Sequence, residues 1–339
     1  MIETFLALLT PMLTLFLYMA LGFTLIKTKI LPENSSKVLA KLLTFLFCPA
    51  LSFMSMAKNF TINNLGTYAS LVVFSSISII IAILLALFLA SLFVKDKHAY
   101  ERNIYKYALA FGNYGYVGAP LVIAAFGMEG YAFFNFVTLP CSIVIYTWGI
   151  STLVPKTELK RSFKDVVKSI LNIPTIGLLI GIVVGITGLG EILFTNSSLK
   201  FLADPITALA NFMAPGAMIL AGITVAKFDF KKMVSSKKVY VATIIRLIVL
   251  PAVILSIMYG VITIVKLIGI NVDYTFLFLG FFLFATPLGM NTIVFPEAYG
   301  GDPKPGASLT LVSHLACVIT IPIMFALLST VLGFYPSFI

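Results

Sequence analysis

Two asparagines lie where glycine and proline interrupt long apolar runs of this sequence. Asn113 belongs to GNYGYVGAPL at residues 112–121, and Asn291 belongs to ATPLGMNTIVFPEAYGGD at residues 285–302. Glycine and proline weaken or break helices. A helix that restarts after a break presents free N–H groups and the positive end of its dipole, which suit a carboxylate. We therefore expect the two breaks to form a binding site for a small anion.

The residues of these breaks have roles that follow from their chemistry. Gly115 and Gly118 allow backbone and ligand to approach closely, Pro120 leaves an acceptor unpaired one turn earlier, and the amino group of Asn113 suits a carboxylate as a donor. A lone Gly-x-x-Gly more often marks close helix packing, but two such breaks with an asparagine each favour a site. The candidate substrate-binding residues are Asn113, Tyr114, Gly115, Gly118, Pro120, Pro287, Gly289, Asn291 and Thr292.

Ionisable side chains are few within the apolar runs, and this limits the mechanism. Arg246 follows Lys238 by eight residues, and two roles stay open for it: its side chain reaches the cytoplasmic interface, or it pairs with an anionic substrate. His314 is expected to be a hydrogen-bonded packing residue rather than a proton relay. There is no buried acidic pair, so coupling to a proton or to sodium stays open. Three acidic residues near the ends of runs are expected to be solvated, namely Glu129, Asp204 and Glu297.

The sequence offers no pattern for catalysis or for a metal. Paired catalytic carboxylates, a His-Glu-x-x-His motif and a serine–histidine arrangement at matched depth are all missing. Cys48, Cys141 and Cys317 lie singly in apolar runs without metal-ligand spacing, as expected for small core residues. We expect neither an enzyme nor a cofactor or metal site.

The elements that must position these residues are membrane helices. Hydrophobic residues make up 60% of the 339 and charged residues 11%, far from the composition of soluble domains. A bilayer core takes about 20 apolar residues per helix, and the chain has no basic leader before Glu3 that would suggest a cleaved signal peptide. The sequence predicts an all-α polytopic protein with ten transmembrane helices, at 4–26, 35–57, 67–94, 104–127, 131–153, 170–187, 199–226, 239–265, 274–300 and 306–332.

Lysine and arginine concentrate in alternate connections of this layout, at 27–37, 95–106, 155–169 and 227–238. By the positive-inside rule these connections are cytoplasmic, so both termini are expected outside the cell membrane. The net charge of +10 is then a signal of topology rather than of nucleic-acid binding.

This orientation predicts which positions a membrane-impermeant thiol reagent reaches. From outside the cell, the reagent should label Phe338→Cys but not Lys160→Cys, because the C-terminus is external and the central basic connection is cytoplasmic. Labelling intact cells and then permeabilised cells measures this. The opposite pattern would reverse the topology.

The chain divides into two halves of five spans, 1–154 and 170–339, joined by the basic connection 155–169. An odd number of spans per half makes the two copies inverted, and interrupted spans at matching positions point to a transport site. CPALSFMSMAK at 48–58 resembles APGAMILAGITVAK at 214–227, and their Pro49 and Pro215 are expected to be kinks that shape the wall of the site. The register between the halves stays open.

The chain resembles the auxin efflux carrier family in its ten-span layout and in the pattern Asn-x-Gly-x-x-Gly-x-Pro-Leu at residues 113–121. This family includes plant auxin carriers and prokaryotic permeases proposed to carry malate, malonate and similar acids. The resemblance implies an inverted repeat with a scaffold and a transport domain, as in the bile-acid carriers. Spans four and nine would break and cross at the membrane midplane beside the substrate. Thr292 departs from the family, because some relatives have a second proline there.

The expected function is a secondary transporter of a small organic anion, a carboxylate or an auxin-like acid, working by an elevator-type movement. The expected partners are this anion, the lipid bilayer, a second copy in a homodimer, and a proton or sodium if transport is coupled; no nucleic acid is expected. Two alternatives stay open: a sodium-coupled relative of the bile-acid carriers and an anion channel. An intramembrane enzyme is disfavoured, because the catalytic patterns are missing.

Overall fold

The computed structural model describes residues 2–32, 34–96, 99–154, 167–168, 171–228, 234–298 and 300–333, which form helices and no β-sheet. The first half contains α1 (Ile2–Lys27), α2 (Ser35–Leu42), the π-helical turn η1 (Leu43–Phe47), α3 (Cys48–Asn59), η2 (Ile62–Asn64), α4 (Leu65–Phe93), α5 (Tyr100–Ala110), the π-helical turn η3 (Tyr114–Gly118), α6 (Ala119–Val144), η4 (Ile145–Gly149) and α7 (Ile150–Leu153).

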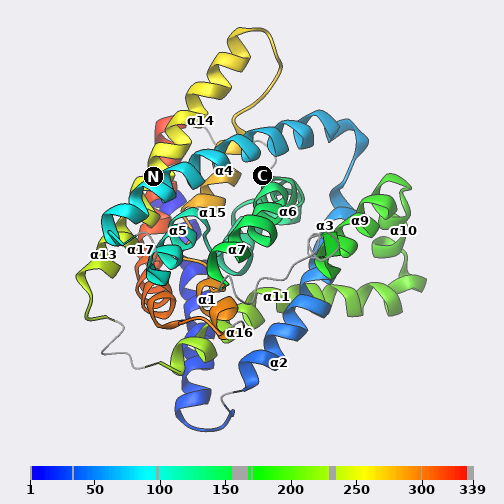
Figure 1. Ribbon diagram of the computed structural model, residues 1–339. Helices are drawn as coiled ribbons and strands as arrows, with labels where there is room; N and C mark the ends of the chain where they lie inside the picture. Colours follow the sequence, from blue (N-terminus) through cyan, green and yellow to red (C-terminus); the bar gives the residue numbers. More distant parts are fainter. Residues whose placement is uncertain are drawn as a thin grey trace.

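The second half of the chain is also helical (Figure 1). It contains α9 (Ile173–Ile186), α10 (Leu189–Thr195), η5 (Ser197–Leu199), α11 (Lys200–Ala226), α13 (Lys237–Ile244), the π-helical turn η6 (Ile245–Val249), α14 (Leu250–Leu267), α15 (Thr275–Phe284), α16 (Asn291–Ala298) and α17 (Lys304–Leu332). Pro49 opens α3 directly after η1, and Pro215 lies within α11.

The prediction of an all-helical polytopic membrane protein is confirmed. Among the described residues, seven helical stretches are long and apolar enough to cross a membrane, or eight if α9 and α10, bent by 95°, form one span. The predicted number of ten spans stays a prediction. One stretch, Tyr114–Leu153, has 40 residues, roughly 60 Å at the rise of an α-helix and about twice the thickness of a bilayer core. Gly127 divides it, because its φ of 64° and ψ of −168° are not helical and favour glycine.

The helices pack in two groups, which we call the first and the second helix group. In the first group α1 packs against α11 and α3 packs against α9, while α11 also contacts α3. The second group contains α4 to α7 and α13 to α17. In Figure 1, α3, α9, α10 and α11 lie together at the right, and α4, α5, α13, α14 and α17 at the left and top. The two groups meet where α1 contacts α6 and α17, and where α3 contacts α6.

Small residues let the helices of the first group approach closely. A β-carbon at Gly22 of α1 would overlap the carbonyl of Ile219 on α11, and one at Gly222 of α11 would overlap the carbonyl of Met19 on α1. Such reciprocal small-residue contacts are typical of helix pairs in membranes, where tight packing replaces the hydrophobic driving force.

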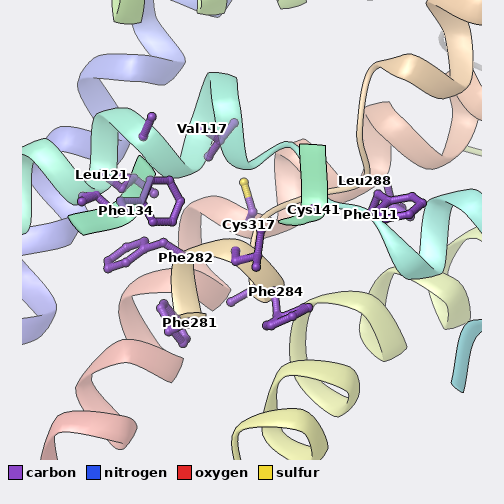
Figure 2. Close-up of a cluster of buried hydrophobic side chains, with 14 of the residues drawn as sticks. Phe111, Val117, Leu121, Phe134, Cys141, Phe281, Phe282, Phe284, Leu288 and Cys317 are labelled. Carbon is purple, nitrogen blue, oxygen red and sulfur yellow. The ribbon is translucent and has the colours of Figure 1, made fainter. Parts of the chain in front are cut away.

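An aromatic core joins α6, α15 and α17 in the second group. The ring of Phe282 lies 5.2 Å from that of Phe325 and 5.9 Å from that of Phe126, within the range of favourable aromatic pairs. Figure 2 shows Phe282 of α15 beside Leu121 and Phe134 of α6. These side chains fix the ends of α15 and α6, which border the broken segments.

Candidate functional site

The two breaks predicted from glycine and proline exist, and they lie side by side. Residues 111–113 separate α5 from η3, and residues 285–290 separate α15 from α16. Asn113 N donates to the carbonyl of Pro287 at 2.7 Å, and Gly112 and Leu288 form an isolated antiparallel bridge. Figure 2 shows Leu288 next to Phe111 at this place. We call the paired segments 111–113 and 285–290 the crossover.

The crossover satisfies its buried backbone within the protein, as irregular backbone at membrane depth requires. Besides the Asn113 contact, the N–H of Leu288 donates to Ser313 Oγ of α17 at 3.1 Å. The N–H of Phe111 continues the last turn of α5 by bonding Tyr107 O at 2.9 Å. Pro287 lacks an N–H altogether, so this residue leaves no donor without a partner.

Arg246 is bound behind the crossover and joins its two halves. Its side chain is 0% exposed. Nη1 donates to Leu109 O at 3.0 Å in the last turn of α5, and Nη2 lies 3.4 Å from Leu283 O in the last turn of α15. The guanidinium of Arg246 therefore donates to carbonyls at the C-terminal ends of two helices, where the helix dipole favours a positive charge. The alternative role at the cytoplasmic interface is wrong, because the guanidinium is buried and bonded inside the protein.

The backbone of Gly112 lies between this guanidinium and the cavity side of the crossover. A β-carbon at Gly112 would overlap Arg246 Nη2 and Thr286 Oγ1. Glycine is required here by this close approach. Arg246 Nε has no hydrogen-bond partner in the described part of the chain, so the cation is not fully compensated by its contacts.

Asn113 is held from behind by His314 of α17. Its Nδ2 lies 3.0 Å from His314 Nε2, and His314 Nδ1 lies 2.7 Å from Thr310 O. A carbonyl only accepts, so Nδ1 carries the ring hydrogen and the neutral ring accepts at Nε2. The Asn113 amino group, which the sequence analysis assigns to a carboxylate, thus has one hydrogen engaged by His314.

Two further polar side chains at the breaks are fixed by buried partners. Asn291 Nδ2 donates to the hydroxyl of Tyr107 at 2.8 Å. Tyr114 OH lies 2.8 Å from Ser142 Oγ, which itself donates to Thr138 O at 3.0 Å, so Tyr114 is the donor. Locked rotamers of this kind prepare a site before a ligand arrives.

A cavity of about 250 Å³ lies beside the crossover, between the two helix groups. One wall comes from the crossover and from α6. The opposite wall belongs to the first helix group and includes Leu43, Thr44, Cys48, Ser52, Thr175 and Met213. None of the described residues that line the cavity carries a charge. Its size suits a small molecule, and its polar groups are hydroxyls and amides.

The structure brings five of the nine predicted site residues to this cavity: Asn113, Tyr114, Gly115, Gly289 and Asn291. The other four have structural contacts instead. Gly118 lies against the carbonyl of Phe282, and Pro120 stands in the first turn of α6. The carbonyl of Pro287 is used by Asn113, and Thr292 Oγ1 donates to Gly289 O at 2.9 Å. Arg246, Pro49 and Pro215 do not reach the lining, although Cys48 beside Pro49 does.

Sequence reasoning missed the part of the cavity that α6 supplies. Tyr131, Asn135, Thr138 and Ser142 all line it. Their spacing of four, three and four residues puts them on one face of a helix, so a polar stripe within an apolar span was a usable signal. The carboxylate of Glu297 lies outside the described side chains.

Comparison with known proteins agrees with a membrane function. A family model described as "Membrane transport protein" matches residues 7–325. No curated protein matches the chain.

Proposed function

This chain belongs to the auxin efflux carrier family, whose members are membrane transporters, and from this premise we propose that it carries a small organic anion through the cavity at the crossover. The observation that carries the proposal is the direction of the helix ends there. Tyr114 and Asn291 begin the helical segments that follow the two breaks, and both line the cavity. The positive ends of these segments therefore point at a bound ligand.

The remaining helix ends support the same sign of charge. The C-terminal ends of α5 and α15 are directed at Arg246 and not at the cavity. Their partial negative charge is thereby compensated, while the guanidinium lies just behind Gly112, which lines the cavity. A buried cation is screened far less than an exposed one, so it favours an anion without touching it. We assign Arg246 this role of an electrostatic partner.

Packing supports an inverted repeat of residues 1–154 and 170–339. In this repeat, span one (α1) corresponds to span six (α9), and span two (α3) corresponds to span seven (α11). The contact between α1 and α11 then corresponds to the contact between α9 and α3, as a two-fold axis requires. The crossover suggests the register: Asn113 pairs with Pro287, 174 residues later. Arg246 binds Leu109 and Leu283, which are also 174 residues apart.

The position of the cavity supports alternating access. Its two walls belong to different helix groups, so movement of the second group along the first would carry the crossover and its ligand together. Transporters with inverted repeats bind substrate near the midplane at such a contact. We propose that the first group is the scaffold and the second the moving transport domain.

The test is a panel of ligands with the purified protein, using malonate, succinate, benzoate and indole-3-acetate, each with its neutral amide. Thermal stabilisation by an acid but not by its amide is expected, since a ligand at 100 times its Kd stabilises by about 2.7 kcal/mol. In proteoliposomes the same acid should show counterflow, which a channel does not. Stabilisation by amides and acids alike would contradict the anion site.

Asn113→Ala is expected to weaken binding of the acid roughly 5- to 150-fold, because stranding a buried partner costs about 1–3 kcal/mol. The matched control is Asn196→Ala, which removes an exposed asparagine that only caps a turn. Isothermal titration measures both affinities. An unchanged affinity in Asn113→Ala, with normal thermal stability, would move the site away from the crossover.

A further inference from the structure

His314 is a buried base in contact with the cavity through one side chain. It is 0% exposed, and its neutral ring accepts an N–H from Asn113 at Nε2. Asn113 lines the cavity, and its Oδ1 has no hydrogen-bond partner in the described part of the chain. An amide whose nitrogen is engaged from behind directs its oxygen elsewhere, so in this state Asn113 is a poor partner for a carboxylate.

We propose that His314 is a proton-binding site through which the carrier takes up one proton with each anion. This inference rests on the proposed function and adds its coupling. It goes beyond a packing role for His314, because the hydrogen-bond chain from Thr310 through His314 to Asn113 ends at the cavity.

Protonation of His314 reverses the hydrogen bond between His314 and Asn113. A proton from water binds His314 Nε2, and the imidazolium then has N–H donors at both nitrogens. Nδ1 keeps its bond to Thr310 O, while Nε2 now requires an acceptor, which Asn113 provides by turning its amide half a turn about the Cβ–Cγ bond. This rotation exchanges oxygen and nitrogen without a change of shape, so it needs no extra space. The amino group of Asn113 then becomes available as a donor to a carboxylate.

The charged groups around His314 make proton binding at its ring depend on a bound anion. α17 packs against α1, α5, α13, α16 and η6. The groups that these elements place near the crossover are Arg246 from η6 and Tyr107 from α5, with the thiols of Cys317 and, from α6, Cys141. No described carboxylate pairs with His314. A positive charge on a ring that is fully buried is unfavourable without a negative partner, so the missing negative charge has to come from the ligand.

The consequence for transport is that anion and proton bind together and leave together. The ligand supplies the charge that stabilises the imidazolium, and the imidazolium turns the donor of Asn113 toward the ligand. By linkage each must raise the affinity of the other by the same factor. One negative charge of the substrate is therefore neutralised in each cycle.

The experiment measures malonate affinity and proton uptake of the whole protein in weakly buffered solution from about pH 7 to 9, where free malonate is already a dianion and binds no proton of its own. In the wild type we expect one proton taken up per malonate, and an affinity that falls about tenfold per pH unit once the free histidine is neutral. His314→Gln can still hydrogen-bond to Asn113 but does not titrate, so its affinity should not change with pH. His98→Gln, which removes the only other histidine, should behave like the wild type.

A second measurement does not depend on a foldable His314 variant. Nitrogen-15 NMR of labelled histidine in the His98→Gln protein should show a neutral Nδ1–H tautomer without ligand and an imidazolium with malonate. An Nε2–H tautomer, or malonate binding without proton uptake, overturns the inference while the anion site stands. If malonate fails to bind at every pH, the proposed function fails for this acid. The tautomer then still decides, because Nε2–H contradicts the hydrogen-bond chain and Nδ1–H supports it.

Discussion

A single methyl group at Gly112 is expected to abolish anion binding. In Gly112→Ala the new β-carbon would overlap the guanidinium of Arg246 and the hydroxyl of Thr286, so the two paired segments must separate or the arginine must leave its carbonyls. Overpacking of this kind costs about 1–3 kcal/mol, and each lost hydrogen bond to a charged group about 1.5–3 kcal/mol more. We expect a loss of unfolding free energy on the order of 3 kcal/mol or greater.

The matched control is Gly115→Ala, three residues further along the same break. A β-carbon there would meet nothing within 4 Å, although Gly115 lines the same cavity. Its thermal stability should equal that of the wild type, and only ligands that fill the cavity should bind less tightly. Detergent-solubilised thermal unfolding and malonate titration of both variants decide this. Equal behaviour of the two variants would show that the contact between Gly112 and Arg246 is not tight.

Arg246→Met is expected to weaken binding of an anion about 30-fold while a neutral analogue loses nothing. Methionine fills much of the same volume but removes the charge behind Gly112. At an intermediate dielectric, two unit charges about 4 Å apart interact by about 4 kcal/mol, and this energy falls inversely with distance. Between the guanidinium and an anion on the far side of one backbone residue, it is roughly 2 kcal/mol. That free energy corresponds to about 30-fold in Kd.

Arg246→Lys separates charge from geometry. Lysine keeps the positive charge but lacks the planar guanidinium. The two terminal nitrogens of that group let one side chain reach carbonyls of both α5 and α15. It should retain most of the preference for malonate over malonamide and lose thermal stability. If Arg246→Met keeps the wild-type ratio between acid and amide, Arg246 is a structural cap and contributes nothing to anion selection.

The breaks were predictable from sequence because glycine and proline act locally. GNYGYVGAPL and ATPLGMN contain residues that stop a helix wherever they stand, and the structure unwinds the chain at both places. The positions of single helices were also predictable, since about 20 apolar residues are a strong signal. In the stretch 114–153 the sequence places a boundary between two spans at 127–131, and the structure has a non-helical glycine, Gly127, at that place.

The partners of the site residues were not predictable, because they come from distant parts of the chain. Asn113 and His314 are 201 residues apart, and nothing in either local sequence indicates the other. Arg246 was recognised as unusual, but whether it faces a ligand, lipid or carbonyl ends depends on the crossing of α5 and α15. The sequence predicts that Gly118 contacts the substrate, whereas in the structure it lies against the carbonyl of Phe282. This contact depends on how the helices pack and has no local sequence signal.

The single arginine behind the crossover breaks the equivalence of the two halves. Two carbonyl ends, at Leu109 and Leu283, share one cation. The span that the proposed repeat makes equivalent is α4, which has no charged residue along Leu65–Phe93. Under the proposed repeat, a two-fold rotation relates the backbones of the two halves, but it does not relate the charges behind the crossover. If the carrier alternates as proposed, we expect its outward-open and inward-open states to hold the anion with different affinity, and by linkage the anion would shift the balance between these states by the ratio of the two affinities. We also expect the empty carrier to respond to voltage, because the buried charge of Arg246 would move with the second group through part of the membrane field.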